Sequence, residues 1–208
     1  MVELINITKK FGNVIAVDKV GLHIEEGDFL ALLGPSGSGK TTTLIMIAGF
    51  EAPDKGDIQI NRESVLDVPP HKRNIGMVFQ NYALFPHLNV YENIKFPLKM
   101  RKIKKSEMRD KVERTLDLVK LPGLENRYPG QLSGGQQQRI ALARALVYDP
   151  PLLLMDEPLG ALDKKLRDHM QLELKQIQRK TGTTVIYVTH DQEEALNMSN
   201  KIAVMKDG

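Results

Sequence analysis

Residues 34–41 read Gly34-Pro35-Ser36-Gly37-Ser38-Gly39-Lys40-Thr41, and this stretch decides the fold of the chain. It fits the pattern G-x-x-x-x-G-K-[ST] at every fixed position, which is typical of a loop that cradles phosphate groups. The glycines let the backbone take positive φ angles, so that successive N–H groups converge on an anion at the start of a helix. Lys40 adds a positive charge for the β- and γ-phosphates, and Thr41 offers a hydroxyl to Mg²⁺. We therefore expect the residues from Gly34 to Thr42 to bind a nucleotide.

The residues on either side of this loop favour a phosphate site over a flexible Gly/Ser loop. Residues 29–33 form a continuous apolar run of the buried-strand type. Residues 42–48 have a helical pattern that ends at Gly49. A strand before the loop and a helix after it identify a nucleotide site, but they leave the task of the protein open.

The composition sets broad limits on the class of protein. Apolar residues make up 41% of the 208 residues and charged residues 26%, as in an ordinary globular domain. A net charge of +3 is too small to indicate nucleic acid, and the absence of cysteine excludes disulfides and a thiol nucleophile. The N-terminus lacks the pattern of a signal peptide, and no apolar run approaches the roughly 20 residues that span a bilayer. At a membrane, we expect other chains to supply the spanning helices.

The apolar patterns predict an α/β fold. We expect buried strands at residues 29–33, 75–79, 152–155 and 183–189, a last strand at residues 202–205, and helices at residues 42–48, 134–147, 166–177 and 191–197. Short apolar patches in the first thirty residues, separated by Gly12-Asn13 and Asp18-Lys19, favour an antiparallel hairpin or meander. Residues 90–121 are helical in pattern, with Ser106 as the expected N-cap.

These elements predict one domain over residues 1–208. Its P-loop NTPase core would hold a mixed β-sheet, with an N-terminal antiparallel β subdomain and an α-helical subdomain inserted at about residues 86–150. The chain ends on Lys206-Asp207-Gly208, a hairpin-turn signal with no second strand after it. We therefore expect a C-terminal continuation that these residues do not include.

Several polar residues follow predicted buried strands. Asp156 and Glu157 come at the end of the apolar run 152–155, and Gln80 and His190 each follow another run. Open α/β sheets bind ligands at the carboxyl ends of their strands, so we expect these side chains to converge on one ligand. Asp156 is the natural Mg²⁺ partner, and Glu157 is placed to orient an attacking water or accept its proton.

A second glycine-rich stretch, Ser133-Gly134-Gly135-Gln136, opens a long predicted helix. It is a second helix terminus suited to an anion, and it is remote in sequence from the first loop. Together with the first loop and the strand-end residues, this stretch resembles the nucleotide-binding subunit of ABC transporters over essentially the whole chain. The resemblance implies an ATPase that uses ATP and Mg²⁺.

The resemblance also implies roles for individual residues. Residues 34–41 correspond to the Walker A motif, 152–157 to Walker B, Ser133–Gln136 to the signature, and Ala161-Leu162-Asp163 to the D-loop. Glu157, His190 and Gln80 would be catalytic, and Thr41, Gln80 and Asp156 would hold Mg²⁺. Phe11 stands where the family more often has a Tyr that stacks on adenine, and it could instead be a core residue of an edge strand.

Partners are implied as well. In the family two copies pair head to tail, either as a homodimer or with another ATPase subunit, so that each signature helix faces the other copy's ATP. The aromatic segment from Gln80 to Pro86 looks exposed and would receive a helix of a membrane-spanning permease, unless it is a packed loop. This places the chain peripherally on the cytoplasmic face of the membrane, with a solute-binding protein involved indirectly. The segments 82–87 and 90–94 resemble importers for sugars, glycerol phosphate, polyamines or metal ions.

Other functions make different demands on the sequence. An ABC-type ATPase of DNA repair would carry a long coiled coil before the signature, and a translation ATPase usually has two cassettes; this chain has neither. A regulatory module that binds nucleotide without hydrolysis is the alternative from another class. Asp156, Glu157 and His190 argue against that module.

Overall fold

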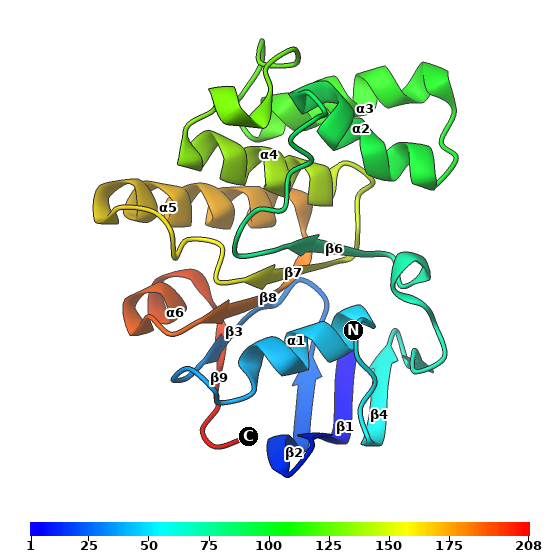
Figure 1. Ribbon diagram of the computed structural model, residues 1–208, viewed down its shortest axis with the longest axis vertical. Coiled ribbons are helices and arrows are strands. Elements are labelled where there is room, and N and C mark those ends of the chain that lie inside the picture. Colours follow the sequence, from blue (N-terminus) through cyan, green and yellow to red (C-terminus); the bar gives the residue numbers. More distant parts are fainter.

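A parallel β-sheet forms the centre of the computed structural model, which describes residues 1–208 (Figure 1). Its strand order is β6-β7-β8-β3-β9, and every neighbouring pair is parallel. The strands are β3 (Phe29–Leu33), β6 (Ile75–Val78), β7 (Leu152–Asp156), β8 (Thr184–Thr189) and β9 (Lys201–Val204). All five expected strands are therefore confirmed, with small shifts at their ends, and β9 is a partly exposed strand at the edge of the sheet.

The antiparallel strands form a second sheet of order β2-β1-β4-β5, with β1 (Val2–Phe11), β2 (Val14–Ile24), β4 (Lys55–Ile60) and β5 (Glu63–Ser64). The α/β class and the N-terminal antiparallel β subdomain are confirmed, and the core sheet is parallel throughout rather than mixed. Of the two expected arrangements, a hairpin or a meander, the structure has the hairpin, in which β1 and β2 form one long antiparallel pair. Asp18 and Lys19 do not form a turn but lie within β2. The pairing of β1 with β2 shifts register between Ile7 and Lys9, and Lys19, at φ 52°, is part of the β-bulge at this shift.

Six α-helices complete the chain: α1 (Lys40–Ala48), α2 (Val90–Met100), α3 (Lys105–Leu118), α4 (Gly134–Leu146), α5 (Lys164–Thr181) and α6 (Gln192–Met198), with 3₁₀ turns at Pro70–Lys72 and Pro129–Gln131. Figure 1 shows α2, α3 and α4 together at one end and the antiparallel sheet at the other. None of the helices has the length and hydropathy needed to cross a bilayer. The extent of the inserted subdomain stays a prediction, although α2 to α4 do lie between β6 and β7 in sequence.

The expected N-cap at Ser106 is wrong. Residues 90–121 form two helices, and the second begins at Lys105 because the Lys104 carbonyl already accepts hydrogen bonds from the N–H groups of Glu107 and Met108. Ser106 consequently lies inside the first turn, where its side chain cannot cap the helix.

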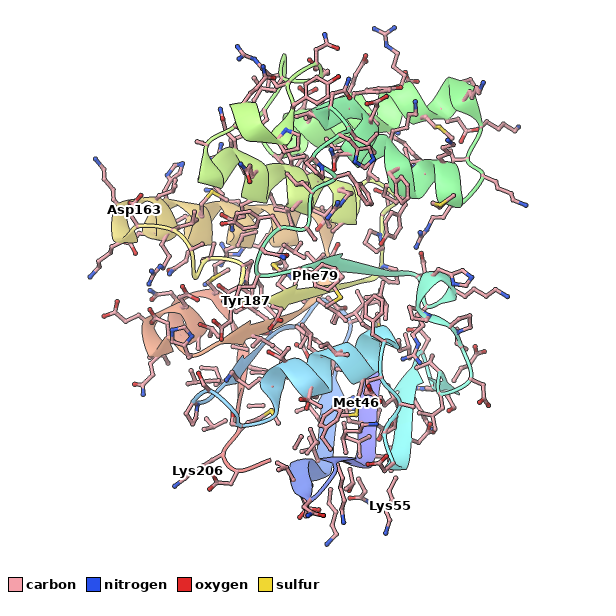
Figure 2. The ribbon with its side chains drawn as sticks, viewed as in Figure 1. Met46, Lys55, Phe79, Asp163, Tyr187 and Lys206 are labelled. Carbon is pink, nitrogen blue, oxygen red and sulfur yellow. The ribbon has the colours of Figure 1, made fainter.

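The parallel sheet separates two apolar cores, which explains its uninterrupted apolar runs. In β7, Leu153 and Met155 pack toward α4 and α5, whereas Leu152 and Leu154 pack toward α1 and the antiparallel sheet. Figure 2 shows Met46 of α1 on this second side, next to the antiparallel strands. Because the strands are parallel, the loops after β3, β6, β7 and β8 all emerge at the same edge of the sheet.

Candidate functional site

The loop between β3 and α1 has the backbone of a phosphate cradle. Gly37 and Gly39 take φ angles of 82° and 92°. A Cβ at Gly39 would collide with the Ala16 carbonyl, and one at Gly34 would collide with the Met205 carbonyl. No side chain caps the start of α1, so its first N–H groups face the loop without a side-chain acceptor. The Ser38 hydroxyl is buried without a hydrogen-bond partner, which fits a loop built around an oxygen-rich ligand.

Lys40 places its positive charge inside this loop. Its side chain is buried, and Nζ donates to the carbonyl oxygens of Gly34 and Pro35, at 2.8 Å each. These bonds hold the ammonium group over the loop backbone. An anion bound by the loop would therefore meet a full charge as well as the dipole of α1.

Thr41 and Asp156 meet although β3 and β7 are separated in the sheet by β8. Thr41 Oγ1 donates to Asp156 Oδ1 at 2.9 Å. Burial of the Asp156 carboxylate raises its pKa. The hydrogen bond from Thr41 and the positive charge of Lys40 lower this pKa, whereas the negative charge of Glu157 raises it further. A hydroxyl and a carboxylate are hard oxygen ligands of the kind that Mg²⁺ uses, and a cation would offset the burial of this carboxylate. These two residues fit a magnesium site.

Glu157 and His190 form the second contact at this edge of the sheet. His190 Nδ1 lies 3.2 Å from Glu157 Oε2. Glu157 has the left-handed φ of 42°, and its N–H donates to the Val188 carbonyl. An L-residue held in this conformation by its neighbours is characteristic of functional sites. The Glu157 carboxylate therefore lies at the same edge of the sheet as the phosphate loop, in contact with the His190 imidazole.

Gln80 and Phe11 lie at the margins of the site. Gln80 is exposed two residues beyond the end of β6, and its side chain bonds neither Thr41 nor Asp156. Its catalytic and metal-binding roles stay predictions.

Phe11 ends β1 with 50% of its surface exposed, and Lys9 Nζ lies 5.4 Å from the ring centroid. Phe11 is therefore not a core residue, and its ring can stack on a ligand.

Ser133–Gln136 is built as a capped helix terminus away from the first loop. The Ser133 hydroxyl accepts from the Gln136 N–H at 3.3 Å, and Gln136 Oε1 accepts from the Ser133 N–H at 2.9 Å. Gly135 packs against Leu166 of α5, so a Cβ there would lie 3.2 Å from the Leu166 side chain. No hydrogen bond or ion pair joins these residues to residues 34–41 of the same chain. One chain does not bring the two motifs together.

The segment after Gln80 is less exposed than its sequence suggests. Tyr82 is only 7% exposed and belongs to the core, so the expectation of an exposed segment is wrong for this residue. Arg144 of α4 donates to the carbonyls of Tyr82 and Ala83, which fastens the segment to that helix. Phe85 is half-buried, with its ring centroid 4.8 Å from that of Phe96.

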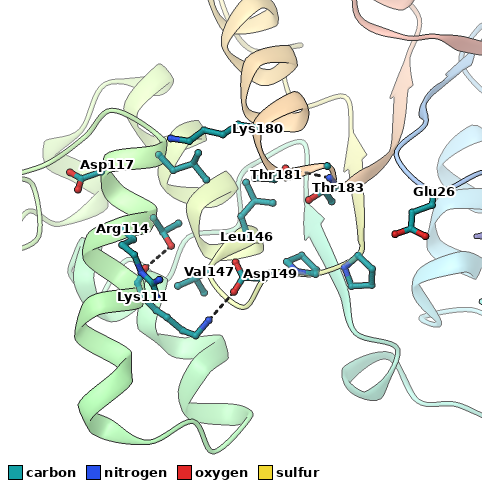
Figure 3. Close-up of a pocket in the computed structure, with 15 residues that line it drawn as sticks. Glu26, Lys111, Arg114, Asp117, Leu146, Val147, Asp149, Lys180, Thr181 and Thr183 are labelled. Carbon is teal, nitrogen blue, oxygen red and sulfur yellow. Dashed lines mark hydrogen bonds and ion pairs between the residues drawn. The ribbon is translucent and has the colours of Figure 1, made fainter.

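An apolar groove and a larger cavity both lie outside the phosphate loop. The segment from Phe79 to Phe85 borders an open, mainly apolar groove of about 380 Å³, whose lining includes Ile75, Met77, Phe79, Phe85, Phe96 and Tyr148. A larger cavity of about 690 Å³ lies where β7 and β8 begin, at the edge of the sheet opposite the carboxyl ends (Figure 3). The Lys111–Asp149 ion pair, 2.8 Å long, crosses its wall. This larger cavity contains none of the predicted site residues.

Comparison with known proteins identifies the family. The family model for ABC transporters matches residues 17–160. The chain belongs to the ABC transporter family. Two solved structures of the ATP-binding cassette MJ0796, both described as dimeric and one as bound to ADP and Pi, share 38% identity with it, with a TM-score of 0.87. Each comparison covers 100% of this chain and 95% of the MJ0796 chain, which confirms the fold.

Curated relatives of this cassette include spermidine/putrescine import ATP-binding proteins named PotA. The protein from Rubrobacter xylanophilus is 58% identical over 207 residues, which is 100% of this chain and 55% of the relative. The protein from Clostridium acetobutylicum is 57% identical over 208 residues, which is 100% of this chain and 59% of the relative. The cassette therefore spans little more than half the length of these relatives.

Proposed function

We propose that this cassette is the ATP-hydrolysing subunit of an ABC importer. The observation that carries the proposal is the pair of contacts beneath the glycine loop: Thr41 with Asp156, and Glu157 with His190. The first contact gathers oxygen ligands for a metal ion beside the phosphates. The second holds a carboxylate where it could accept a proton. A binding-only module would need the first contact but not the second.

The chemistry assigned to these residues follows from their types and positions. The loop from Gly34 to Thr42 and Lys40 would bind the phosphates, and Thr41 and Asp156, with Gln80, would hold Mg²⁺. Bound Mg²⁺ would neutralise charge on the phosphate oxygens. Glu157 would orient the attacking water and accept its proton, and His190 would keep the Glu157 carboxylate in place. Phe11 would stack on the adenine.

The second half of the site would come from another copy or from a paired ATPase subunit. The Ser133–Gln136 terminus has an exposed serine and glycine at the start of a helix, a position suited to a phosphate. Its separation from residues 34–41 within one chain supports a head-to-tail pair in which each terminus faces the other copy's loop. The two MJ0796 structures are described as dimeric, which supports the pairing of two cassettes.

The groove beside residues 79–85 is the proposed docking site for a permease. Its lining is mainly apolar and aromatic, as expected of a surface that receives the apolar face of a helix. Arg144 connects the docking segment to α4, which begins at the Ser133–Gln136 terminus, so a movement at the groove would reach the ATP site. We therefore place the cassette on the cytoplasmic face of the membrane, bound to its permease.

The proposed solute is a polyamine. The names of the relatives from R. xylanophilus and C. acetobutylicum support this choice over sugars, glycerol phosphate and metal ions. The solute itself would be recognised by the permease and by a solute-binding protein, so no residue described above is assigned to it.

Phosphate release from ATP tests the enzymatic part of this proposal. We expect the purified protein to release phosphate only with Mg²⁺, and Lys40→Met to abolish both ATP binding and release. Lys10→Met, at an exposed lysine, is the matched control and should behave as wild type. ATP binding without hydrolysis in the wild type would instead indicate a regulatory module.

Uptake measurements test the transport part. Cells that lack this gene should lose uptake of labelled spermidine and putrescine and keep uptake of maltose and glycerol phosphate. Unchanged polyamine uptake would exclude this solute class.

A further inference from the structure

A buried network lies behind the Glu157–His190 contact, and it is built around Glu194 of α6. This carboxylate is 4% exposed. Its Oε2 accepts hydrogen bonds from the Tyr187 hydroxyl and the Thr189 hydroxyl, each at 2.8 Å. Thr189 Oγ1 in turn accepts from the Asp191 N–H at 3.0 Å. The residues on both sides of His190 are therefore tied to one buried acid.

Arg167 of α5 closes the network on the other side. Its Nε is buried without a hydrogen-bond acceptor and lies 3.8 Å from Glu194 Oε1. Its NH1 lies 3.5 Å from Asp191 Oδ2, and its NH2 donates to the Leu162 carbonyl at 3.0 Å. The guanidinium group thus joins the Ala161–Asp163 loop to the segment that carries His190. Figure 2 shows Asp163 at the start of α5 and Tyr187 in the neighbouring sheet.

His190 itself has little else to hold it. Its side chain is 60% exposed, and its contact with Glu157 is the one polar contact that the imidazole makes. The direction of the ring consequently depends on the backbone at residues 189–191. Glu194 holds this segment through the Thr189 hydroxyl, which accepts from the Asp191 N–H, and Arg167 contacts the Asp191 carboxylate.

We propose that Arg167 and Glu194 are positioning residues that hold His190 against Glu157 and connect this contact to the Ala161–Asp163 loop. The inference rests on the proposed ATPase function. A buried acid with one cation and two hydroxyl partners has a defined geometry, and removing the charge of Arg167 leaves the Glu194 carboxylate buried without its cation. Loss of either residue should therefore misplace His190 without touching the phosphate loop.

Steady-state hydrolysis by the intact protein tests the inference. We expect Arg167→Gln and Glu194→Gln each to lower kcat about 10-fold or more with little change in KM, because small misplacements of reacting groups cost up to about 100-fold in rate. Arg167→Lys keeps the charge and should recover part of the loss. The matched controls are Arg179→Gln on α5 and Glu193→Gln on α6, both at exposed side chains without ion pairs, and both should keep the wild-type rate.

A second measurement, in protein that already carries His190→Ala, distinguishes a positioning role of Arg167 from a general effect on protein stability. In His190→Ala protein, whose residual single-turnover rate serves as the reference, Arg167→Gln should lower the rate no further. The inference is wrong if Arg167→Gln lowers that residual rate by the same factor as in wild type, or if both single variants keep the wild-type kcat. Absence of hydrolysis in the wild type would instead contradict the proposed function.

Discussion

His190 Nδ1 lies 3.2 Å from Glu157 Oε2, although the two residues follow different strands, β8 and β7. The neighbouring parallel strands pair Asp156 with Val188, so the residues after each strand emerge side by side. The contact places the proposed base and the residue that restrains it at the edge where the phosphate loop opens.

The first prediction concerns Glu157. Glu157→Gln should lower the rate of phosphate release by a factor of about 100 to 10,000, the usual contribution of a general base. ATP binding should persist because the phosphate loop is unchanged, and the dimer should become more stable because ATP is no longer consumed. Phosphate release, ATP binding and sedimentation measure these effects, with Glu63→Gln in exposed β5 as control. Unchanged turnover would show that Glu157 is not the base.

The second prediction concerns the stability of the free protein against pH. Burial raises the folded-state pKa of Asp156 above its unfolded value near 3.8. The folded state therefore binds the proton more tightly, and this contribution to stability is lost as the pH rises through the folded pKa. Asp156→Asn should become progressively more stable relative to wild type as the pH rises above about 4, while losing Mg²⁺-dependent hydrolysis.

Urea unfolding at several pH values, without nucleotide, measures the difference in free energy of unfolding between Asp156→Asn and wild type. Asp163→Asn, an exposed N-cap carboxylate, is the comparison for a general loss of charge. A difference that shrinks as the pH rises would contradict the assigned direction.

The third prediction tests whether the Ser133–Gln136 terminus acts on the partner's site. Lys40→Met disables a phosphate loop, and Ser133→Arg blocks a terminus. If the site is shared, a dimer with one change in each copy keeps one intact site and hydrolyses ATP. A dimer with both changes in one copy and none in the other has no intact site and should be inactive.

Mixed dimers purified with two different affinity tags allow this measurement. The opposite pattern, activity only when both changes lie in one copy, would show that each chain completes its own site. Removal of the Ser133 cap should cost about 1 kcal/mol of stability, which thermal unfolding of the Ser133→Arg protein can check.

The fourth prediction concerns two aromatic residues after Gln80, one that borders the proposed permease groove and one that packs in the core. Phe85 borders the apolar groove, so Phe85→Ala should reduce solute uptake while ATP binding is retained. Tyr82 is buried, so Tyr82→Ala should instead lower the free energy of unfolding by about 3 kcal/mol or more. Uptake by cells and thermal unfolding of the purified variants distinguish the two effects. Normal uptake with Phe85→Ala would place the docking site elsewhere.

The sequence predicted the strand–loop–helix order around Gly34–Thr41 and the position of the two acids at the end of β7 because these signals are local. A glycine loop after an apolar run and before a helix has few structural alternatives, and β3, the loop and α1 lie where the pattern placed them. It misjudged Asp18-Lys19, Ser106 and Tyr82 for one common reason. A bulge, a helix start and a buried tyrosine each depend on what lies opposite in space, and spacing along the chain does not contain that information.

By itself, the sequence determined the residue types and their order: the loop Gly34–Thr41, the acids Asp156 and Glu157, His190, and the second helix start at Ser133. Which of them meet depends on how the chain packs. The tertiary structure joined Thr41 to Asp156 and Glu157 to His190, left Ser133 apart from the loop, and placed Arg167 and Glu194 behind His190. The physical reason is that strand order and register set these contacts, and both arise from long-range packing of the two cores.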